Sequence, residues 1–350
     1  MSERVFEVLD PGLLTTVQDR GRYGYQRFGV PVAGAMDVFS LRAANILVGN
    51  DQNAACLEMT GTAPKLRVLA DTIIAVTGGD LAILVDDAPL PRWAGVRVSK
   101  GSVLTSEGAE DGFRAYLAVA GGIDVPVVLG SRSTYMKSGL GGFEGRALKQ
   151  GDILSALPLE PGHEMRERGL PMDLEPLRYG NEHELRVVPG PQDNAFASEG
   201  LSTLFSSQFT VSSTSDRVGY RLEGPKLKHK KGADIISDGS PLGAVQVPGD
   251  GSPIILLADR GPTGGYAKIA TVISIDVGRL AQAAPGDTVT FKQVTVEEAQ
   301  ALLKDAEAVL RSLDPDASSG AVGGVSILVD GQEYEVSTDR GAALFDPLTP

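Results

Sequence analysis

The sequence predicts a mainly β protein made of two related antiparallel β-barrels, and three observations lead to this fold class. Short runs of β-branched and aliphatic residues, bounded by Gly, Pro, Asp or Asn, recur throughout the chain. The runs follow one another too closely to hold a crossover helix between each pair, which argues against a parallel α/β sheet. The 350 residues suffice for two domains with separate cores, and 43 Gly and 21 Pro allow the many tight turns that short strands require.

The predicted strands include residues 72–76, 81–85, 115–119, 254–257 and 271–275. Only a few short helices are expected. Asp37 should cap a helix that runs to about Val48 and ends at Gly49, and another helical segment is expected over 193–205. The clearest helix is a C-terminal amphipathic one over 295–313. It opens with a capping box from Thr295 to Glu298 and should pack on the second barrel.

Each half of the chain contains a Gly-Asp turn that leads into a closing strand, at residues 150–154 and 285–289. We therefore expect a first β-barrel domain over 1–160, which carries the Gln18-Asp19-Arg20-Gly21 loop, and a second over 184–315. A Pro- and Glu-rich linker over 161–183 should join them. Residues 316–350 form an acidic tail. There, Asp330-Gly331 between strand-like runs at 325–329 and 332–336 is typical of a type I′ hairpin.

Composition excludes several classes of protein. The 32 basic and 45 acidic side chains leave a net charge of −13, which argues against general nucleic-acid binding. No apolar run reaches the length of a membrane helix and the N-terminus lacks a secretory pattern, so a cytoplasmic protein is expected. Cys56 is the single cysteine, so no internal disulfide and no metal site are expected. His163, His183 and His229 fall in polar linker or loop sequence, which leaves acid–base chemistry to Asp, Glu, Lys or Tyr.

The densest chemical block spans residues 14–37, where a strand runs into a Gly-rich loop and then a capped helix. Arg20 and Arg22 could offer planar forks to a carboxylate or bicarbonate, and the start of the helix could add backbone donors for an anion. A structural loop with an internal Asp19–Arg20 pair fits the pattern equally well. The binding candidates in this block are Gln18, Arg20, Arg22, Gln26, Ala35, Met36 and Asp37, and Asp19 is a candidate acid or base.

Two later blocks repeat the combination of Asp-Arg with Gly and Tyr. Residues 212–221 contain Asp216, Arg217 and Tyr220, and residues 258–268 follow a buried-looking strand. The backbone N–H groups of Thr263, Gly264 and Gly265 could form an oxyanion nest. Each block alone is typical of a turn, but three of them predict one shared cleft. Asp216, Tyr266 and Lys268 join Asp19 as catalytic candidates, and Arg217, Tyr220, Asp259 and Thr263–Gly265 join the substrate-binding set.

These blocks, in this order, resemble the KipA proteins, the C subunits of 5-oxoprolinase, which are also called allophanate-hydrolase subunit 2 or biotin-dependent carboxyltransferase proteins. The resemblance covers residues 1–312 nearly continuously, and its stretch 243–247 adds Gln246 to the substrate-binding candidates. It implies two cyclophilin-like β-barrels. The family's third block usually reads Asp-x-Gln-Thr-Thr-Gly-Gly-Tyr-Pro-Lys, whereas this chain has Gly261, Pro262 and Ala267 in place of Gln, Thr and Pro. The acceptor could therefore differ from that of better-known members.

The resemblance leaves three functions open. The first is a subunit of an ATP-dependent 5-oxoprolinase, which opens 5-oxo-L-proline to L-glutamate together with a KipI-like subunit and a third subunit, with no covalent cofactor. The second is a urea-carboxylase-like carboxyltransferase that moves CO2 from carboxybiotin to a small amide or amine. The chain has no Met-Lys-Met motif, so biotin would arrive on a partner subunit. The third is a non-catalytic regulatory binder of a KipI-like protein.

Overall fold

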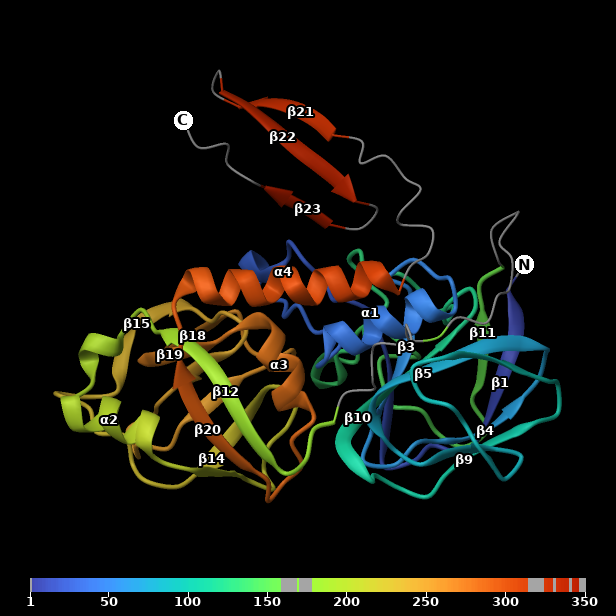
Figure 1. Ribbon diagram of the computed structural model, residues 1–350, viewed down its shortest axis with the longest axis horizontal. Coiled ribbons are helices and arrows are strands. Elements are labelled where there is room, and N and C mark those ends of the chain that lie inside the picture. Colours follow the sequence, from blue (N-terminus) through green and yellow to red (C-terminus); the bar gives the residue numbers. More distant parts are fainter. Residues whose placement is uncertain are drawn as a thin grey trace.

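The computed structural model describes residues 2–158, 169 and 178–313, and the backbone of three further strands between 324 and 345. The described chain forms two β-rich halves that lie side by side, with helix α4 (Val296–Ser312) across the top of both (Figure 1). The prediction of a mainly β protein with a few short helices is confirmed. Among the described residues, no helix combines the length and apolar character needed to cross a membrane.

The first half consists of two sheets that share one hydrophobic core. In order across the first sheet, the strands are β11 (Ile153–Ala156), β1 (Glu3–Asp10), β4 (Lys65–Val68), β9 (Val103–Ser106), β6 (Ile83–Val85) and β7 (Ala88–Pro89). The second sheet contains β2 (Leu14–Gln18), β3 (Cys56–Thr60), β10 (Asp111–Val119), β5 (Thr72–Asp80) and β8 (Gly95–Val98). Two loops leave this half, one with η1 (Gln26–Phe28) and one with η2 (Met136–Ser138).

The second half is a closed seven-stranded barrel around its own core. Its strands, in order, are β12 (Glu182–Pro189), β19 (Lys268–Val272), β16 (Ala244–Gln246), β17 (Ile254–Leu256), β14 (Gly219–Glu223), β13 (Phe209–Val211) and β20 (Thr288–Gln293). Outside the barrel, β15 (Asp234–Gly239) and β18 (Thr263–Tyr266) form a two-stranded sheet. Three short helical segments also lie there: η3 (Asp193–Ala195), α2 (Ser198–Ser206) and α3 (Ser274–Ala281).

The predicted strand over 271–275 is wrong at its end, because β19 stops at Val272 and α3 begins at Ser274. Alternation of β-branched residues there suggested a strand. The helix is favoured instead by Asp276 in its first turn, where a carboxylate interacts well with the helix dipole. Asp276 also accepts hydrogen bonds from Arg186 of β12, which fix α3 against the barrel.

The Gly-Asp turns in the two halves have the same hydrogen bonds. In the first half, Gly151 N donates to Val8 O at 2.8 Å and Val8 N donates to Asp152 O at 2.9 Å. In the second half, Gly286 and Asp287 make the same two bonds with Val211, at 2.9 and 2.8 Å. Both glycines have a positive φ, +88° and +98°, which glycine adopts without strain. The repeat seen in the sequence is therefore a repeated structural unit.

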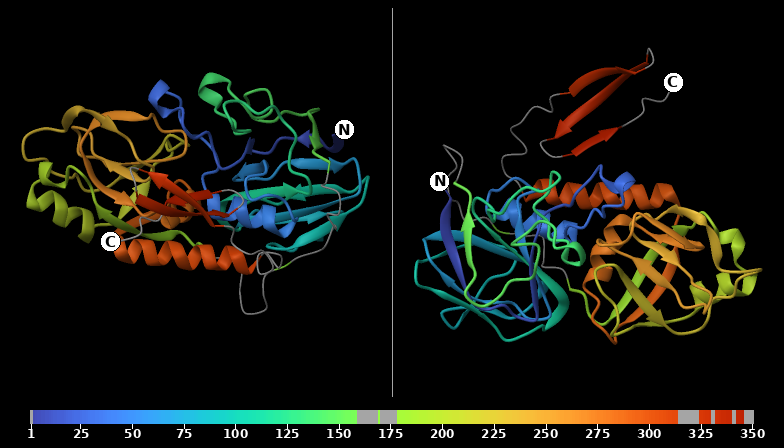
Figure 2. Two further views of the ribbon diagram at one scale, coloured as in Figure 1. Left: turned by 90° about the horizontal axis from the view of Figure 1, so that it is seen from above. Right: turned by 180° about the vertical axis from the view of Figure 1, so that it is seen from behind.

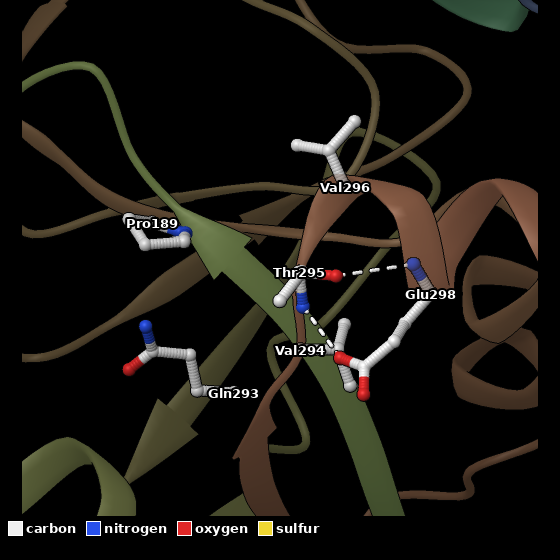
Figure 3. A pocket seen from close by; sticks show the side chains of 6 residues that line it. All are labelled: Pro189, Gln293, Val294, Thr295, Val296 and Glu298. Carbon is white, nitrogen blue, oxygen red and sulfur yellow. Dashed lines mark hydrogen bonds between the residues drawn. The ribbon is translucent and has the colours of Figure 1, made fainter.

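The capping predictions are confirmed. Helix α1 (Val38–Leu47) begins after Asp37, whose carboxylate accepts a hydrogen bond from Ser40 N at 3.0 Å. At the start of α4, Thr295 and Glu298 form a reciprocal capping box, with N–O distances of 2.7 and 3.1 Å (Figure 3). The box satisfies two backbone donors that a helix start would otherwise leave unpaired.

The packing of α4 corrects one expectation, because the helix contacts both halves and not the second barrel alone. Arg42 of α1 makes a two-pronged ion pair with Glu307 of α4, in which Nη2 lies 2.8 Å from Oε2. Leu310 and Leu313 pack in a cluster with residues of the first half, and α4 also contacts α3. An amphipathic stripe predicts that a helix has a buried face, but not which partner covers it.

The expected linker mostly lies outside the described residues, and its end differs from the prediction. Strand β12 starts at Glu182, so His183 belongs to the barrel and is buried, with Nε2 3.2 Å from Asp287 Oδ2. Tyr179 and Gly180 are anchored by their N–H groups to Asp111. In the tail, β21 (Gly324–Val329) pairs with β22 (Gln332–Asp339) as the hairpin pattern predicts, and β23 (Ala342–Phe345) adds a third strand.

Candidate functional site

The structure brings the three Asp-Arg blocks together at the junction of the two halves. Ala33 N, in the first block, donates to Ala258 O in the third at 3.1 Å, and Asp259 N donates to Arg217 O of the second at 2.8 Å. Seen from above, the loop with η1 lies between the loop with η2 and the second barrel (Figure 2). The side chains of the three blocks nevertheless have very different surroundings.

Arg217 is the centre of a buried ionic cluster and is 5% exposed. Its Nε and Nη2 lie 3.1 and 3.0 Å from the two carboxylate oxygens of Asp259, its Nη1 pairs with Glu58, and Nη2 also donates to Gly34 O at 2.5 Å. Burial alone would lower the pKa of Arg217, but the two carboxylates outweigh it and raise the pKa. Every guanidinium nitrogen is engaged, so Arg217 has no free fork for a substrate anion and instead joins the two halves.

The start of α1 is also used within the protein. Met36 N donates to Glu58 at 2.8 Å, and Asp37 N donates to Tyr116 Oη at 2.7 Å, which itself donates to Glu58 at 2.8 Å. Burial and the Glu58 charge raise the pKa of Tyr116 well above its ordinary value, so this phenol stays a neutral donor. Ala35 N donates to Asp19 O, so the backbone donors predicted for an external anion already have partners inside the chain.

Glu58 therefore has a structural role that the sequence alone did not define. It lies on β3, between β2 and β10, and is 2% exposed. The available signal was a lone carboxylate between Leu57 and Met59 in an apolar run, which requires a buried cation nearby.

Asp19 is a fully bonded carboxylate that anchors the loop before η2. It accepts hydrogen bonds from Gly21 N at 2.8 Å, Ser131 Oγ at 2.7 Å, Arg132 N at 2.6 Å and Ser133 Oγ. Arg22, also buried, donates from Nε to Val128 O and from Nη2 to Ser133 O, and burial lowers its pKa. These two side chains hold the loops with η1 and η2 together.

The remaining candidates of the first two blocks divide into structural and accessible groups. Gln18 is buried and donates to Thr16 Oγ1 and Thr134 O, and Asp216 accepts from Val218 N and Gly219 N within its own turn. Tyr220 is buried and accepts from Arg114 at 2.5 Å. Gln26, by contrast, is exposed on η1, and Arg20 is half-buried.

A second group of predicted residues surrounds Lys268 at one end of the second barrel. Lys268 is 1% exposed, and its Nζ donates to Asp238 Oδ2 at 3.1 Å. Gln246 lies opposite Lys268 in the β16–β19 pair, and its Nε2 is buried without a partner among the described residues. A Cβ on Gly264 would come within 2.4 Å of that Nε2, so a larger residue there would have to displace the Gln246 amide. The buried ammonium of Lys268 thus has one carboxylate partner, Asp238, and the amide donor of Gln246 has none among the described residues.

The oxyanion nest predicted for Thr263–Gly265 is not present, because these residues form strand β18, paired with β15. Successive N–H groups of a strand point in opposite directions and cannot converge on one oxygen. Tyr266 ends this strand and is 41% exposed. Sequence reasoning missed Asp238 and Gln192, which share the contact to Lys268, because their loop-like surroundings carried no distinguishing pattern.

Two other features of the described chain offer no catalytic chemistry. A pocket at the start of α4 has a volume of about 430 Å³. Figure 3 shows the side chains that line it, of which the charged one, Glu298, is used in the capping box. No group of three or more His, Cys, Asp or Glu side chains within the described ranges could hold a metal ion.

Comparison with known proteins places this geometry in a family. The model of the carboxyltransferase domain, subdomain A and B, matches residues 28–293. The C subunit of 5-oxoprolinase from Escherichia coli (strain K12) is 40% identical over 311 residues, which make up 88% of this chain and 97% of that protein. The urea amidolyase of Saccharomyces cerevisiae is 35% identical over 324 residues, 88% of this chain but 18% of that protein.

The crystal structure of the K. lactis urea amidolyase matches with a TM-score of 0.84 at 31% identity, over 97% of this chain and 22% of that one. The resemblance inferred from the sequence blocks is thereby confirmed. The chain belongs to the carboxyltransferase domain A and B family and is a relative of the bacterial 5-oxoprolinase C subunits.

Proposed function

We propose that the chain is the C subunit of a hetero-oligomeric 5-oxoprolinase, which opens 5-oxo-L-proline to L-glutamate with consumption of ATP. The observation that carries this proposal is the 40% identity to the C subunit of the E. coli 5-oxoprolinase over nearly the whole of both chains. Two partners, a KipI-like protein and a third subunit, make up the rest of the proposed enzyme. ATP is a co-substrate of the complex. This chain lacks a Gly-x-x-x-x-Gly-Lys-Ser/Thr loop, so we assign the binding of the ATP phosphates to the assembled complex.

The proposed substrate site is the group around Lys268. The substrate is a small lactam with a carboxylate, so it needs a fixed cation and amide donors. Lys268 makes one hydrogen bond to Asp238, which leaves two of its three N–H donors for a substrate oxygen. Gln246 Nε2 is a buried donor without a partner among the described residues, and a substrate oxygen there would remove the cost of burying it unpaired.

The other predicted residues take positioning roles in this proposal. Arg217, Glu58 and Asp259 hold the two halves in register, and Asp19 with Arg22 holds the loops with η1 and η2 beside the second barrel. Gln26 and Tyr266, which are exposed, and Arg20, which is half-buried, are proposed to face the substrate or the KipI-like subunit.

The test is to co-express the chain with its two proposed partner subunits and measure glutamate formation from 5-oxo-L-proline. Glutamate should appear only when ATP and all three subunits are present. The matched control is the same complex with Lys268→Met, which should assemble normally and form little glutamate. A complete complex that forms no glutamate would contradict the proposal.

The runner-up function is a carboxyltransferase, favoured by the family model and by the fold match to urea amidolyase. In that case a biotin carrier would come from a partner subunit. The two functions differ in their requirements: a carboxyltransferase complex would capture a biotinylated carrier and consume bicarbonate, and avidin would inhibit it. Avidin should have no effect on the proposed 5-oxoprolinase.

A further inference from the structure

A separate cavity of about 310 Å³ is lined by residues of α1, α3 and α4 at the junction of the two halves. Figure 1 shows these three helices next to one another. It is lined in part by Phe39, Trp93, Arg178, Arg186, Arg279 and Leu313, and none of the residues around Lys268 contributes to it. Ligand pockets begin at about this volume. The lining combines aromatic side chains with three guanidinium groups, which distinguishes it from an ordinary packing gap.

The aromatic wall is built around Trp93 in an unusual conformation. Its φ is +56°, a left-handed value that bulky side chains rarely adopt. The side chain is 3% exposed, its ring centroid lies 6.2 Å from that of Phe39, and its Nε1 is buried without a partner among the described residues. Backbone strain and an unpaired buried donor at one residue are features that concentrate at functional sites.

The charged part of the lining is positive overall. Arg186 is neutralised by Asp276, with Nε at 2.8 Å and Nη2 at 2.5 Å from its two oxygens. Arg178 and Arg279 are exposed, and neither forms an ion pair within the described part of the chain. Asp37, the remaining acidic residue of the lining, already accepts hydrogen bonds from Ser40 and Gln282. Two arginines are thus available for an anion beside an apolar wall.

We propose that this cavity binds a small organic anion, whose flat ring packs against Trp93 and Phe39 and whose carboxylate or phosphate pairs with Arg178 and Arg279. Guanidinium groups bind either anion in a planar, two-pronged geometry. This site is independent of the proposed substrate site and does not rest on the proposed function. Because its lining comes from both halves and from α4, a bound anion would connect all three.

Trp93 is the only tryptophan in the chain, so tryptophan fluorescence of the purified protein reports directly on this cavity. Benzoate and AMP serve as probes that combine a flat ring with a carboxylate or a phosphate, while acetate and inorganic phosphate lack the ring. We expect a saturable fluorescence change with benzoate, AMP or both, and none with acetate or phosphate.

The variant Arg279→Ala should weaken binding of the effective probe by about tenfold or more, and Arg178→Ala should have a similar effect. Arg4→Ala, at an exposed arginine of β1 far along the chain from the cavity lining, is the matched control and should bind as the unaltered protein does. Thermal unfolding in the presence of the probe gives a second measurement, because a ligand of the folded state raises Tm. Both arginines are exposed, so the variants should keep the Tm of the ligand-free protein.

The proposal is overturned if tryptophan fluorescence shows no saturable change with either probe at concentrations up to about 10 mM, because a Kd above that value would mean very weak binding. It is also overturned if Arg279→Ala and Arg178→Ala bind as well as Arg4→Ala. A saturable change in Trp93 fluorescence with 5-oxo-L-proline would show that the substrate binds in this cavity, which contradicts a site separate from the substrate site. In that case the substrate would not bind at Lys268, and the Lys268→Met complex should still form glutamate.

Discussion

Arg217 of the second half and Glu58 of the first half form an ion pair buried at the junction between them. The two residues are 159 positions apart in the sequence, and each is saturated with further partners: Asp259 and Gly34 for Arg217, Met36 and Tyr116 for Glu58. A buried charge without its partner is strongly unfavourable. The pair therefore links the two halves at their junction.

Removing Arg217 should weaken the fold severely. Arg217→Ala leaves Glu58 and Asp259 buried without their cation and should lower the free energy of unfolding by about 3–5 kcal/mol. The measurement is urea unfolding followed by circular dichroism. Arg221→Ala, at an exposed arginine four residues later, is the control and should change the free energy of unfolding by no more than about 0.5 kcal/mol. Equal stability of the two variants would show that the buried pair does not hold the halves together.

The ion pair between α1 and α4 should give a pH-dependent contribution to stability. The hydrogen bonds from Arg42 lower the pKa of Glu307 below its ordinary value. A carboxyl whose pKa is lower in the folded state stabilises the fold above its unfolded pKa, about 4.3, and loses that contribution as the pH falls through its folded pKa. Glu307→Gln should therefore cost about 1 kcal/mol at neutral pH, the upper end for a partly exposed pair.

Unfolding of Glu307→Gln and the unaltered protein should be compared at pH 7 and at successively lower pH. The difference in unfolding free energy should shrink as the pH falls below about 4.3. Asp305→Asn, at an exposed position on the same helix, is the control and should show no such trend. A difference that stays constant with pH would mean that Glu307 acts through packing rather than through its charge.

Lys268 is the residue on which the proposed substrate site most depends. Losing a hydrogen bond to a charged group costs about 1.5–3 kcal/mol, so Lys268→Met should reduce kcat/KM for 5-oxo-L-proline in the assembled complex by about 10- to 150-fold. Lys230→Met is the matched control, since Lys230 is exposed and donates to Asn194 O at the surface. If both variants retain full activity, the site has been assigned to the wrong residues.

The close approach of Gly264 to Gln246 offers a steric test of the same site. The methyl carbon that Gly264→Ala adds would lie 2.4 Å from Gln246 Nε2, which is closer than van der Waals contact, and must displace that amide. We expect a rise in KM for 5-oxo-L-proline, with the barrel intact by circular dichroism. Gly261→Ala is the control, because its nearest non-neighbouring atom is Thr263 O at 3.5 Å. Unchanged kinetics in Gly264→Ala would remove Gln246 from the substrate site.

Local features of the fold could be predicted from sequence because they depend on neighbouring residues. The Asp37 cap, the Thr295–Glu298 capping box and the two Gly-Asp turns are formed by residues within a few positions of one another. The strand at 271–275 was misassigned at its end because Asp276 interacts with Arg186, 90 residues away, and this contact has no local signature. The packing of α4 against the first half likewise depends on distant residues such as Arg42 and has no local signature.

The sequence by itself determined the strand-rich class, the duplication, the helix caps and the family, along with a set of polar candidate residues. The tertiary structure alone decided what each of those residues does. Asp19, Arg217 and Lys268 look alike in sequence, each a charged residue in a Gly- and Tyr-containing block. Long-range packing gives Asp19 four donors and Arg217 two carboxylates, while Lys268 makes one hydrogen bond to Asp238. A charged group can bind a ligand only through donors or acceptors that the fold has not already used. Lys268, although ion-paired with Asp238, keeps more of its donors than Arg217, and this difference is set by contacts between distant parts of the chain.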